Sequence, residues 1–206
     1  MSTNRLLLPA LIALLTACAP ITEDGERPHG RIGVAVPAPT VSLDDWQAPA
    51  QLGTFQLQGN LQPAGQDVRL YRYVDARRPQ EALELVVYSF PGGWEDLDPA
   101  RVVDGHFPQA REAELARLMR SHRRQVRESL QPTRSDPSLA YPVATSLFDV
   151  EASQPAQGSV LMLSAARPLF LRLRLNTVGT APADRVAEMQ PLLVEFQRQL
   201  QAHGGH

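Results

Sequence analysis

The chain has 206 residues, with 20 basic and 22 acidic side chains and a formal net charge of −2. A charge this close to zero supplies no overall positive field to attract a polyanion, so we expect no nucleic-acid partner. All the basic residues are arginine, which excludes a Schiff-base lysine and a phosphate-loop lysine. The single cysteine excludes a disulfide within the chain.

Residues 1–17 predict a signal peptide. Arg5 and the amino terminus form a short positive segment, and residues 6–17 follow as an apolar run. That run is too short for a transmembrane helix, which needs ~20 residues. It ends in the letters LTAC, with Cys18 last, and this ending resembles the lipobox of bacterial lipoproteins. The resemblance implies cleavage before Cys18 by signal peptidase II, a diacylglyceryl group on its sulfur and an acylated amino terminus. The alternative is an ordinary secretory signal with an incidental cysteine.

The residue after the cysteine bears on location. Ala19 stands where many lipoproteins of the inner membrane carry an aspartate. The resemblance therefore implies a lipid anchor in the outer membrane, facing the periplasm, with the inner membrane less favoured. Residues 18–50 are rich in proline and glycine and show no sustained periodicity. They predict a tether behind the lipidated cysteine, and about thirty residues of coil span roughly 30 Å root-mean-square.

Residues 51–206 predict one globular domain. Strand-like alternation is found in residues 55–61 and 68–74, and residues 83–90 are rich in β-branched and aromatic side chains. We expect the last two segments to form a hairpin with a long polar loop. Asp98 followed by Pro99 predicts a helix start, with the helix continuing past Pro108 to about Leu130. Three further strands are expected at residues 143–151, 159–165 and 169–178, and a closing helix from about Pro182 to Gln201.

The predicted order is β-β-β-α-β-β-β-α. It indicates an antiparallel sheet of about six strands with two main helices, in a sandwich-like α+β fold. This order, with the ending LFLRLRLNTV, a loop and a helix, resembles the PsbP-like fold of photosystem accessory proteins and several bacterial envelope lipoproteins. The resemblance implies an accessory or binding module more often than an enzyme, and it assigns no site residues.

The sequence contains no recognisable catalytic or metal-binding motif. The letters QGSVL around Ser159 lack the second glycine of a serine-hydrolase elbow, and the five histidines form no HExxH pair. The acidic group Glu95, Asp96 and Asp98 lacks the ligand spacing of a calcium loop, and Asp98 is expected as a helix cap. We therefore expect no catalytic residue, no metal and no cofactor. A glycosidase-like pair of carboxylates that meet only on folding stays an alternative.

One cluster of arginines stands out in the predicted first helix. At 100° per residue, four arginines fall in one stripe beside the apolar face, which includes His122, while Glu114 and Glu128 fall on the opposite flank. The members of the stripe are Arg117, Arg120, Arg124 and Arg127. Arginine suits bidentate contact with phosphate or carboxylate, so the stripe predicts a surface for an anionic lipid or an acidic envelope protein. The alternative is a solvated helix face in an arginine-rich protein.

These observations lead to three hypotheses. The first is an outer-membrane-anchored lipoprotein that faces the periplasm and acts as a non-enzymatic binding or accessory module. The second is a hydrolase of envelope polymers with a carboxylate-based site. The third is a purely structural lipoprotein.

Overall fold

The computed structural model describes residues 46–63 and 67–203. The predicted signal peptide, Cys18 and most of the predicted tether lie outside the described residues. The described chain forms eight strands, two α-helices and one short 3-10 helix. In chain order they are β1 (Gln51–Leu52), β2 (Phe55–Leu61), β3 (Val68–Asp75), β4 (Arg78–Ser89), α1 (Pro99–His122), β5 (Val126–Arg134), β6 (Val143–Val150), β7 (Gln157–Ala166), β8 (Leu169–Val178), η1 (Pro182–Arg185) and α2 (Val186–His203).

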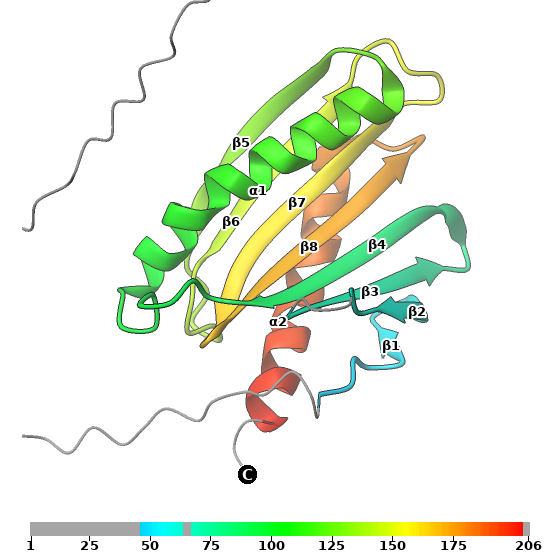
Figure 1. Cartoon of the computed structure of the whole chain (residues 1–206). Helices are drawn as coiled ribbons and strands as arrows, with labels where there is room; N and C mark the ends of the chain where they lie inside the picture. Colours follow the sequence, from blue (N-terminus) through cyan, green and yellow to red (C-terminus); the bar gives the residue numbers. More distant parts are fainter. Residues whose placement is uncertain (1–45, 64–66, 204–206) are drawn as a thin grey trace, which may run out of the picture. The chain divides into compact units, whose positions relative to one another are not determined.

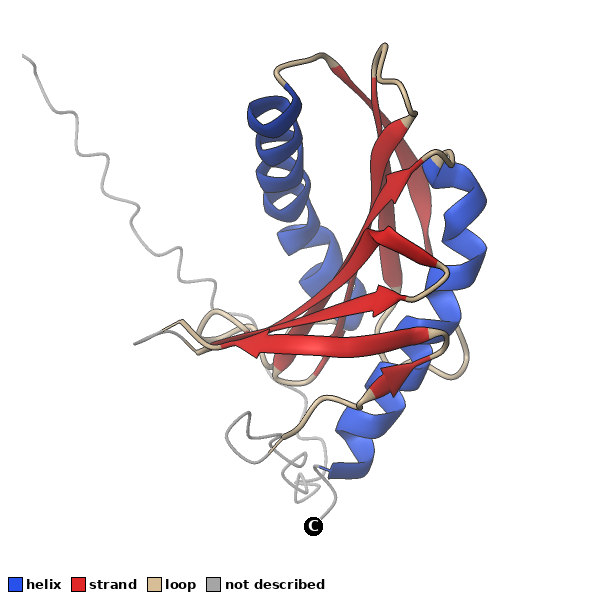
Figure 2. Ribbon diagram, turned by 90° about the vertical axis from the view of Figure 1, so that its right-hand side faces the viewer, coloured by secondary structure: helices blue, strands red, loops and turns tan. Residues whose placement is uncertain are grey.

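The strands form one antiparallel sheet in the order β1-β2-β3-β4-β8-β7-β6-β5. The two helices lie on opposite faces of this sheet, so the elements form three layers (Figure 2). On one face, α1 packs against β5, β6 and β7. The same face of β3 and β4 has no helix over it (Figure 1). This uneven cover leaves part of the sheet open beside α1.

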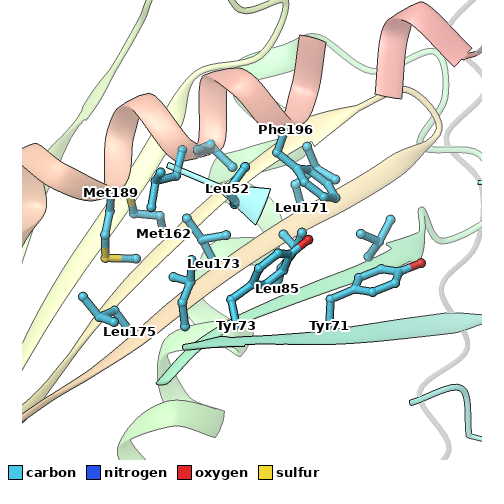
Figure 3. Close-up of a cluster of buried hydrophobic side chains, with 14 of the residues drawn as sticks. Leu52, Tyr71, Tyr73, Leu85, Met162, Leu171, Leu173, Leu175, Met189 and Phe196 are labelled. Carbon is cyan, nitrogen blue, oxygen red and sulfur yellow. The ribbon is translucent and has the colours of Figure 1, made fainter. Parts of the chain in front are cut away.

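The main core lies between the sheet and α2 (Figure 3). Alternate residues of β8 face α2, and Leu169, Leu171, Leu173 and Leu175 are all buried there. The buried side chains of α2 recur at helical spacing; they include Met189, Leu193, Phe196 and Leu200.

The core also includes residues before the first strand. Trp46 is buried and makes edge-on contacts with Tyr71 and Phe196, at centroid distances of 5.2 and 4.8 Å. The hydroxyl of Tyr73 donates to the carbonyl oxygen of Pro49 at 3.1 Å. Packing thus begins before residue 51.

A second core fills the space between α1 and the other face of the sheet. Val102, Val103 and Phe107 project from α1 onto Phe148 and Phe170. Phe170 belongs to β8 and points away from the leucines that flank it, because successive side chains of a strand point to opposite faces. Both faces of β8 are therefore covered near its start, although its sequence shows half-polar alternation.

The mixed α+β class and the two helices agree with the prediction, but the strand number is eight rather than about six. The two additional strands are β1 and β5. The helix expected to reach about Leu130 ends at His122, where Arg123 takes a left-handed conformation (φ 51°) and its N–H donates to the Met119 carbonyl at 2.9 Å. This is a common way for a helix to end, although glycine usually holds the position.

The β3–β4 connection also differs from the expected long loop. Only Ala76 and Arg77 separate the two strands. The Asp75 carboxylate accepts from the backbone N–H of Arg77 at 2.9 Å and from its guanidinium at 2.9 Å. Aspartate stabilises tight turns by accepting from the backbone two residues ahead. The polar letters that predicted a loop therefore belong mostly to the start of β4.

Candidate functional site

A cleft runs between α1 and the open part of the sheet, and we call it the α1 cleft. Asp98 positions the helix, since its carboxylate accepts from the N–H groups of Ala100 and Arg101 at 2.9 and 3.4 Å. One edge of α1 forms the wall of the cleft, and strands β3, β4, β7 and β8 form its floor. The wall residues recur every three or four positions: Gln109, Ala110, Ala113, Glu114, Arg117 and Arg120.

The cleft has two adjoining compartments. The first, about 280 Å³, is lined mainly by Val68, Val86, Tyr88 and Ala110, with His106 and Gln109 on the helix side. The second, about 250 Å³, is lined by four arginines together with Glu114 and three apolar side chains. The arginines are Arg117 and Arg120 from α1 and Arg172 and Arg174 from β8. Arg172 and Ala110 line both compartments, so the two compartments adjoin at these residues.

A buried ion network holds one side of the cationic compartment. Glu114 is only 4% exposed and accepts from both Arg117 (2.6 and 2.8 Å) and Arg174 (3.1 Å). Arg174 also pairs with Glu84 of β4, and Arg117 donates to the side-chain oxygen of Asn176 at 2.8 Å. The network joins α1, β4 and β8. Its two arginines are occupied by carboxylates of the protein itself.

The pKa of Glu114 lies below its usual range. Burial by itself raises the pKa of this carboxyl, but the hydrogen bonds from Arg117 and the charge of Arg174 outweigh burial. Glu114 is therefore ionised at neutral pH. A general acid in a glycosidase needs the opposite shift, toward a raised pKa.

The other two arginines of the cleft are not compensated in this way. Within residues 46–63 and 67–203, neither Arg120 nor Arg172 has a carboxylate at ion-pair distance. Arg120 is exposed and Arg172 is half-buried. A half-buried guanidinium without an anionic partner loses solvation without gaining a charge-assisted hydrogen bond. An anion entering the cleft would supply that bond.

A tyrosine and a histidine lie beside Arg172. The Tyr88 hydroxyl and the Nε2 atom of His106 are hydrogen-bonded at 2.8 Å, and the His106 ring stacks on Phe170 with centroids 4.2 Å apart. Burial, and secondarily the charge of Arg172, lowers the pKa of His106, while burial raises the pKa of Tyr88 to about 12. Both groups are therefore neutral at pH 7, and the positive charge at this point belongs to Arg172.

The structure places only half of the predicted arginine stripe in the cleft. Arg117 and Arg120 line it. Arg124 follows the end of the helix and donates to the Ala152 carbonyl at 2.8 Å, and Arg127 lies in β5, 3.5 Å from a carboxylate oxygen of Asp149. The prediction that all four arginines form one stripe was wrong, because the helix ends at His122.

The two glutamates also differ from their expected positions. Glu114 is not on an opposite flank but pairs with Arg117 of the same stripe. Glu128 lies in β5 and accepts from Arg111 of α1 at 2.6 Å. His122, expected on the apolar face, is half-buried at the end of α1. Opposite charges three positions apart on a helix are neighbours, so the Glu114–Arg117 pair was readable from spacing.

Sequence reasoning missed Arg172, Arg174, Tyr88 and His106 as parts of a site. The alternation of residues 169–178 did place Arg172 and Arg174 on one face of a strand. It could not indicate that α1 borders that face. His106 gave no motif, because its partners are 18 and 64 residues away in the chain.

A second, wider hollow of about 810 Å³ lies on the outer side of α2, beside the loop that follows β5. Its lining carries both signs of charge, with Arg134 and Arg198 against Asp136 and Glu195. Arg198 and Glu195 pair with each other. This balance gives no preference for an ion of either sign, so we take the α1 cleft as the candidate site.

Among residues 46–63 and 67–203, no three histidine, cysteine, aspartate or glutamate side chains come together in a way that could hold a metal ion. Neither α1 nor α2 has a segment long and apolar enough to cross a membrane.

Comparison with known proteins gives weak structural similarity alone. No protein-family model matches the chain, and no curated protein matches it. Among solved structures, the chain is similar to the cyanobacterial PsbP protein (CyanoP) of Synechocystis sp. PCC 6803. The identity is 13%, the TM-score is 0.42, and the match covers 71% of this chain and 81% of that one. This similarity is weak, and it assigns no activity.

Proposed function

We propose that this protein is a lipid-anchored protein of the cell envelope whose α+β domain binds an anionic envelope component in the α1 cleft, without catalysing a reaction on it. The anchor part of the proposal is supported by the lipobox-like ending at Cys18. By that resemblance the protein is held in the outer membrane and faces the periplasm. Three acyl chains anchor a protein far more firmly than one.

The observation that carries the binding part is the pair of uncompensated arginines, Arg120 and Arg172, in one cleft. They come from different elements, so only the folded domain brings them together. Arginine forms strong bidentate contacts with phosphate and carboxylate. Arg117 and Arg174 are paired with Glu114 and Glu84, so they are not free to bind an anion.

The carboxylate chemistry of the cleft favours binding over hydrolysis. Glu114 is the carboxylate that lines it, and two arginines hold that group ionised. A carboxylate-based hydrolase needs one carboxyl with a raised pKa as general acid. A purely structural role gives no reason for two unpaired arginines to face the same cleft.

The test is photocrosslinking in living cells from position 113. Ala113 is exposed and lines the cationic compartment, whereas Glu112 is exposed on the same helix and lines neither compartment. We expect a probe at 113 to capture a species that carries phosphate or carboxylate groups, identified by mass spectrometry, and a probe at 112 not to capture it.

The arginine dependence is the second part of the test. Capture from 113 should fall at least tenfold in the double variant Arg120→Gln/Arg172→Gln. The matched control is Arg101→Gln/Arg123→Gln, which removes the same charge from exposed positions that do not line the cleft. Equal capture at 112 and 113, or capture that survives the cleft variant, would overturn the proposal.

A further inference from the structure

The two compartments of the α1 cleft differ in chemistry, and this difference restricts what the cleft can bind. The cationic compartment holds the unpaired Arg120 and Arg172. The other compartment, whose floor is formed by Val68, Val86 and Tyr88, has no charged lining residue except Arg172. Arg172 is therefore the point where a positive group meets an apolar surface.

The apolar surface continues from Arg172 across the sheet in one row. Arg172 of β8 is the cross-strand partner of Val86, Val86 of Leu70, and Leu70 of Leu61. Residues paired in this way project from the same face, and neighbouring strands are ~4.8 Å apart, so the row extends roughly 14 Å from Arg172.

No helix of the described chain covers this row. α1 packs over β5, β6 and β7, on the other side of Arg172, and Figure 1 shows the face of β3 and β4 without a helix above it. Leu70 is half-buried and Leu61 is 59% exposed. The row is buried at Val86 and becomes more exposed toward Leu61. Apolar side chains that are left open beside an unpaired arginine are a feature of ligand grooves.

Neither a purely polar nor a purely apolar ligand matches both the cationic compartment and the apolar row. A small inorganic anion would satisfy the arginines and leave the row in water. A neutral apolar molecule would cover the row and leave Arg172 more deeply desolvated without a partner, which is unfavourable. Tyr88 and His106 are already bonded to each other and are neutral, so they add an apolar wall and no competing charge.

We infer that the α1 cleft binds an amphipathic anion, with its phosphate or carboxylate head at Arg120 and Arg172 and its apolar part along Val86, Leu70 and Leu61. This inference rests on the proposed function, because it assumes that the cleft binds an anion, and it adds the class of that anion.

The test measures binding by isothermal titration calorimetry with the full chain carrying Cys18→Ser, which has no thiol to be acylated. The probes are decyl phosphate, butyl phosphate, inorganic phosphate and the neutral decyl maltoside, each below its micelle concentration. We expect decyl phosphate to bind at least tenfold more tightly than inorganic phosphate or decyl maltoside. Arg120→Gln/Arg172→Gln should weaken it at least tenfold, and Arg101→Gln/Arg123→Gln should leave it unchanged.

Leu61, at the far end of the row, gives a sharper test of where the alkyl chain of the ligand lies. Leu61→Ser removes an exposed side chain and should leave the fold intact. It should weaken decyl phosphate several-fold and leave butyl phosphate unchanged, because a four-carbon chain does not reach Leu61. Leu97→Ser, an exposed leucine that does not line the cleft, is the matched control and should change neither.

The outcomes separate this inference from the proposed function. If inorganic phosphate binds as tightly as decyl phosphate and depends on Arg120 and Arg172, the amphipathic class is wrong and anion binding stands. If decyl maltoside binds as well as decyl phosphate, the head-group assignment is wrong. If no probe shows arginine-dependent binding, this inference is overturned, and crosslinking from position 113 decides the proposed function independently.

Discussion

Arg172 takes its position from the alternation of β8. The flanking Leu171 and Leu173 are buried in the core beneath α2, so Arg172 must project from the opposite face. There it lies near His106, and its charge, added to burial, lowers the pKa of that imidazole. A protonated His106 would bring a second positive charge next to Arg172 in a partly desolvated place. The neutral imidazole instead bonds Tyr88.

Replacing Arg172 tests this electrostatic coupling. Arg172→Gln should raise the pKa of His106, because a neighbouring positive charge disfavours the imidazolium. The pKa should still stay below the usual ~6.5, because burial remains the larger cause. The measurement is an NMR titration of the His106 ring protons. Arg127→Gln, on β5 beside Asp149, is the control and should leave the titration unchanged; an unchanged titration in Arg172→Gln would contradict the coupling.

At the scale of elements, charged side chains attach α1 to the sheet at two edges. On one edge, Arg111 pairs with Glu128 of β5 at 2.6 Å. On the other, Glu114 joins Arg117 to Arg174 of β8. Between these edges the apolar side chains of α1 pack on Phe148 and Phe170. The Glu114 network therefore sets the spacing between α1 and β8, and with it the width of the cationic compartment.

Glu114→Gln should destabilise the domain by about 3 kcal/mol near pH 7, because it leaves partly buried arginines without a compensating charge. The loss should depend on pH. The pKa of Glu114 is lower in the folded chain than the ~4.3 expected for an unfolded one, so its stabilisation is complete above that pH and is lost as the pH falls through the folded value. The difference between wild type and variant, measured by urea unfolding, should shrink below about pH 4.

The matched variant for this experiment is Glu112→Gln, on an exposed position of the same helix. It should change the free energy of unfolding by less than about 0.5 kcal/mol. A Glu114→Gln effect that is equally large at pH 3 and pH 7 would show that packing, not charge, is what Glu114 contributes.

At the scale of the whole molecule, contacts from several elements enclose the main core between the sheet and α2. The buried Arg185 of η1 donates to the buried Glu81 of β4 at 2.8 Å and also pairs with Glu188 of α2. Trp46 closes the same core from the amino-terminal side, against Tyr71 and Phe196. The domain is thus held on the α2 face independently of the α1 cleft, so variants of the cleft need not disturb the main core.

The proposed anchor makes a prediction for the whole chain. Cys18→Ser removes the thiol that lipid transfer requires, so incorporation of labelled palmitate and sedimentation with the outer-membrane fraction should both be lost. Thr16→Ser keeps a small side chain before the cleavage site and should preserve both. Palmitate incorporation that persists in Cys18→Ser would contradict lipidation at this residue and favour an ordinary secretory signal.

Some features of this protein follow from local residue patterns. β2 occupies the residues predicted for it, β8 does the same, and Asp98 caps α1 as expected, because each depends on alternation or spacing within one segment. The predicted lipobox is local in the same sense. The end of α1 was mispredicted because Val126 and Leu130 fit both the spacing of a helix and the alternation of a strand.

The α1 cleft was decided by tertiary structure alone. Alternation showed that Arg172 and Arg174 share a face of their strand, but it carries no information about which helix borders that face. Arg172 lies beside Val86 because β8 pairs with β4, and Leu70 and Leu61 extend the row because β3 and β2 pair in turn. These three apolar residues are distant from Arg172 in the sequence. Strand order and helix placement are set by the packing of the whole core. A positive group beside an apolar row therefore exists only once the sheet has formed.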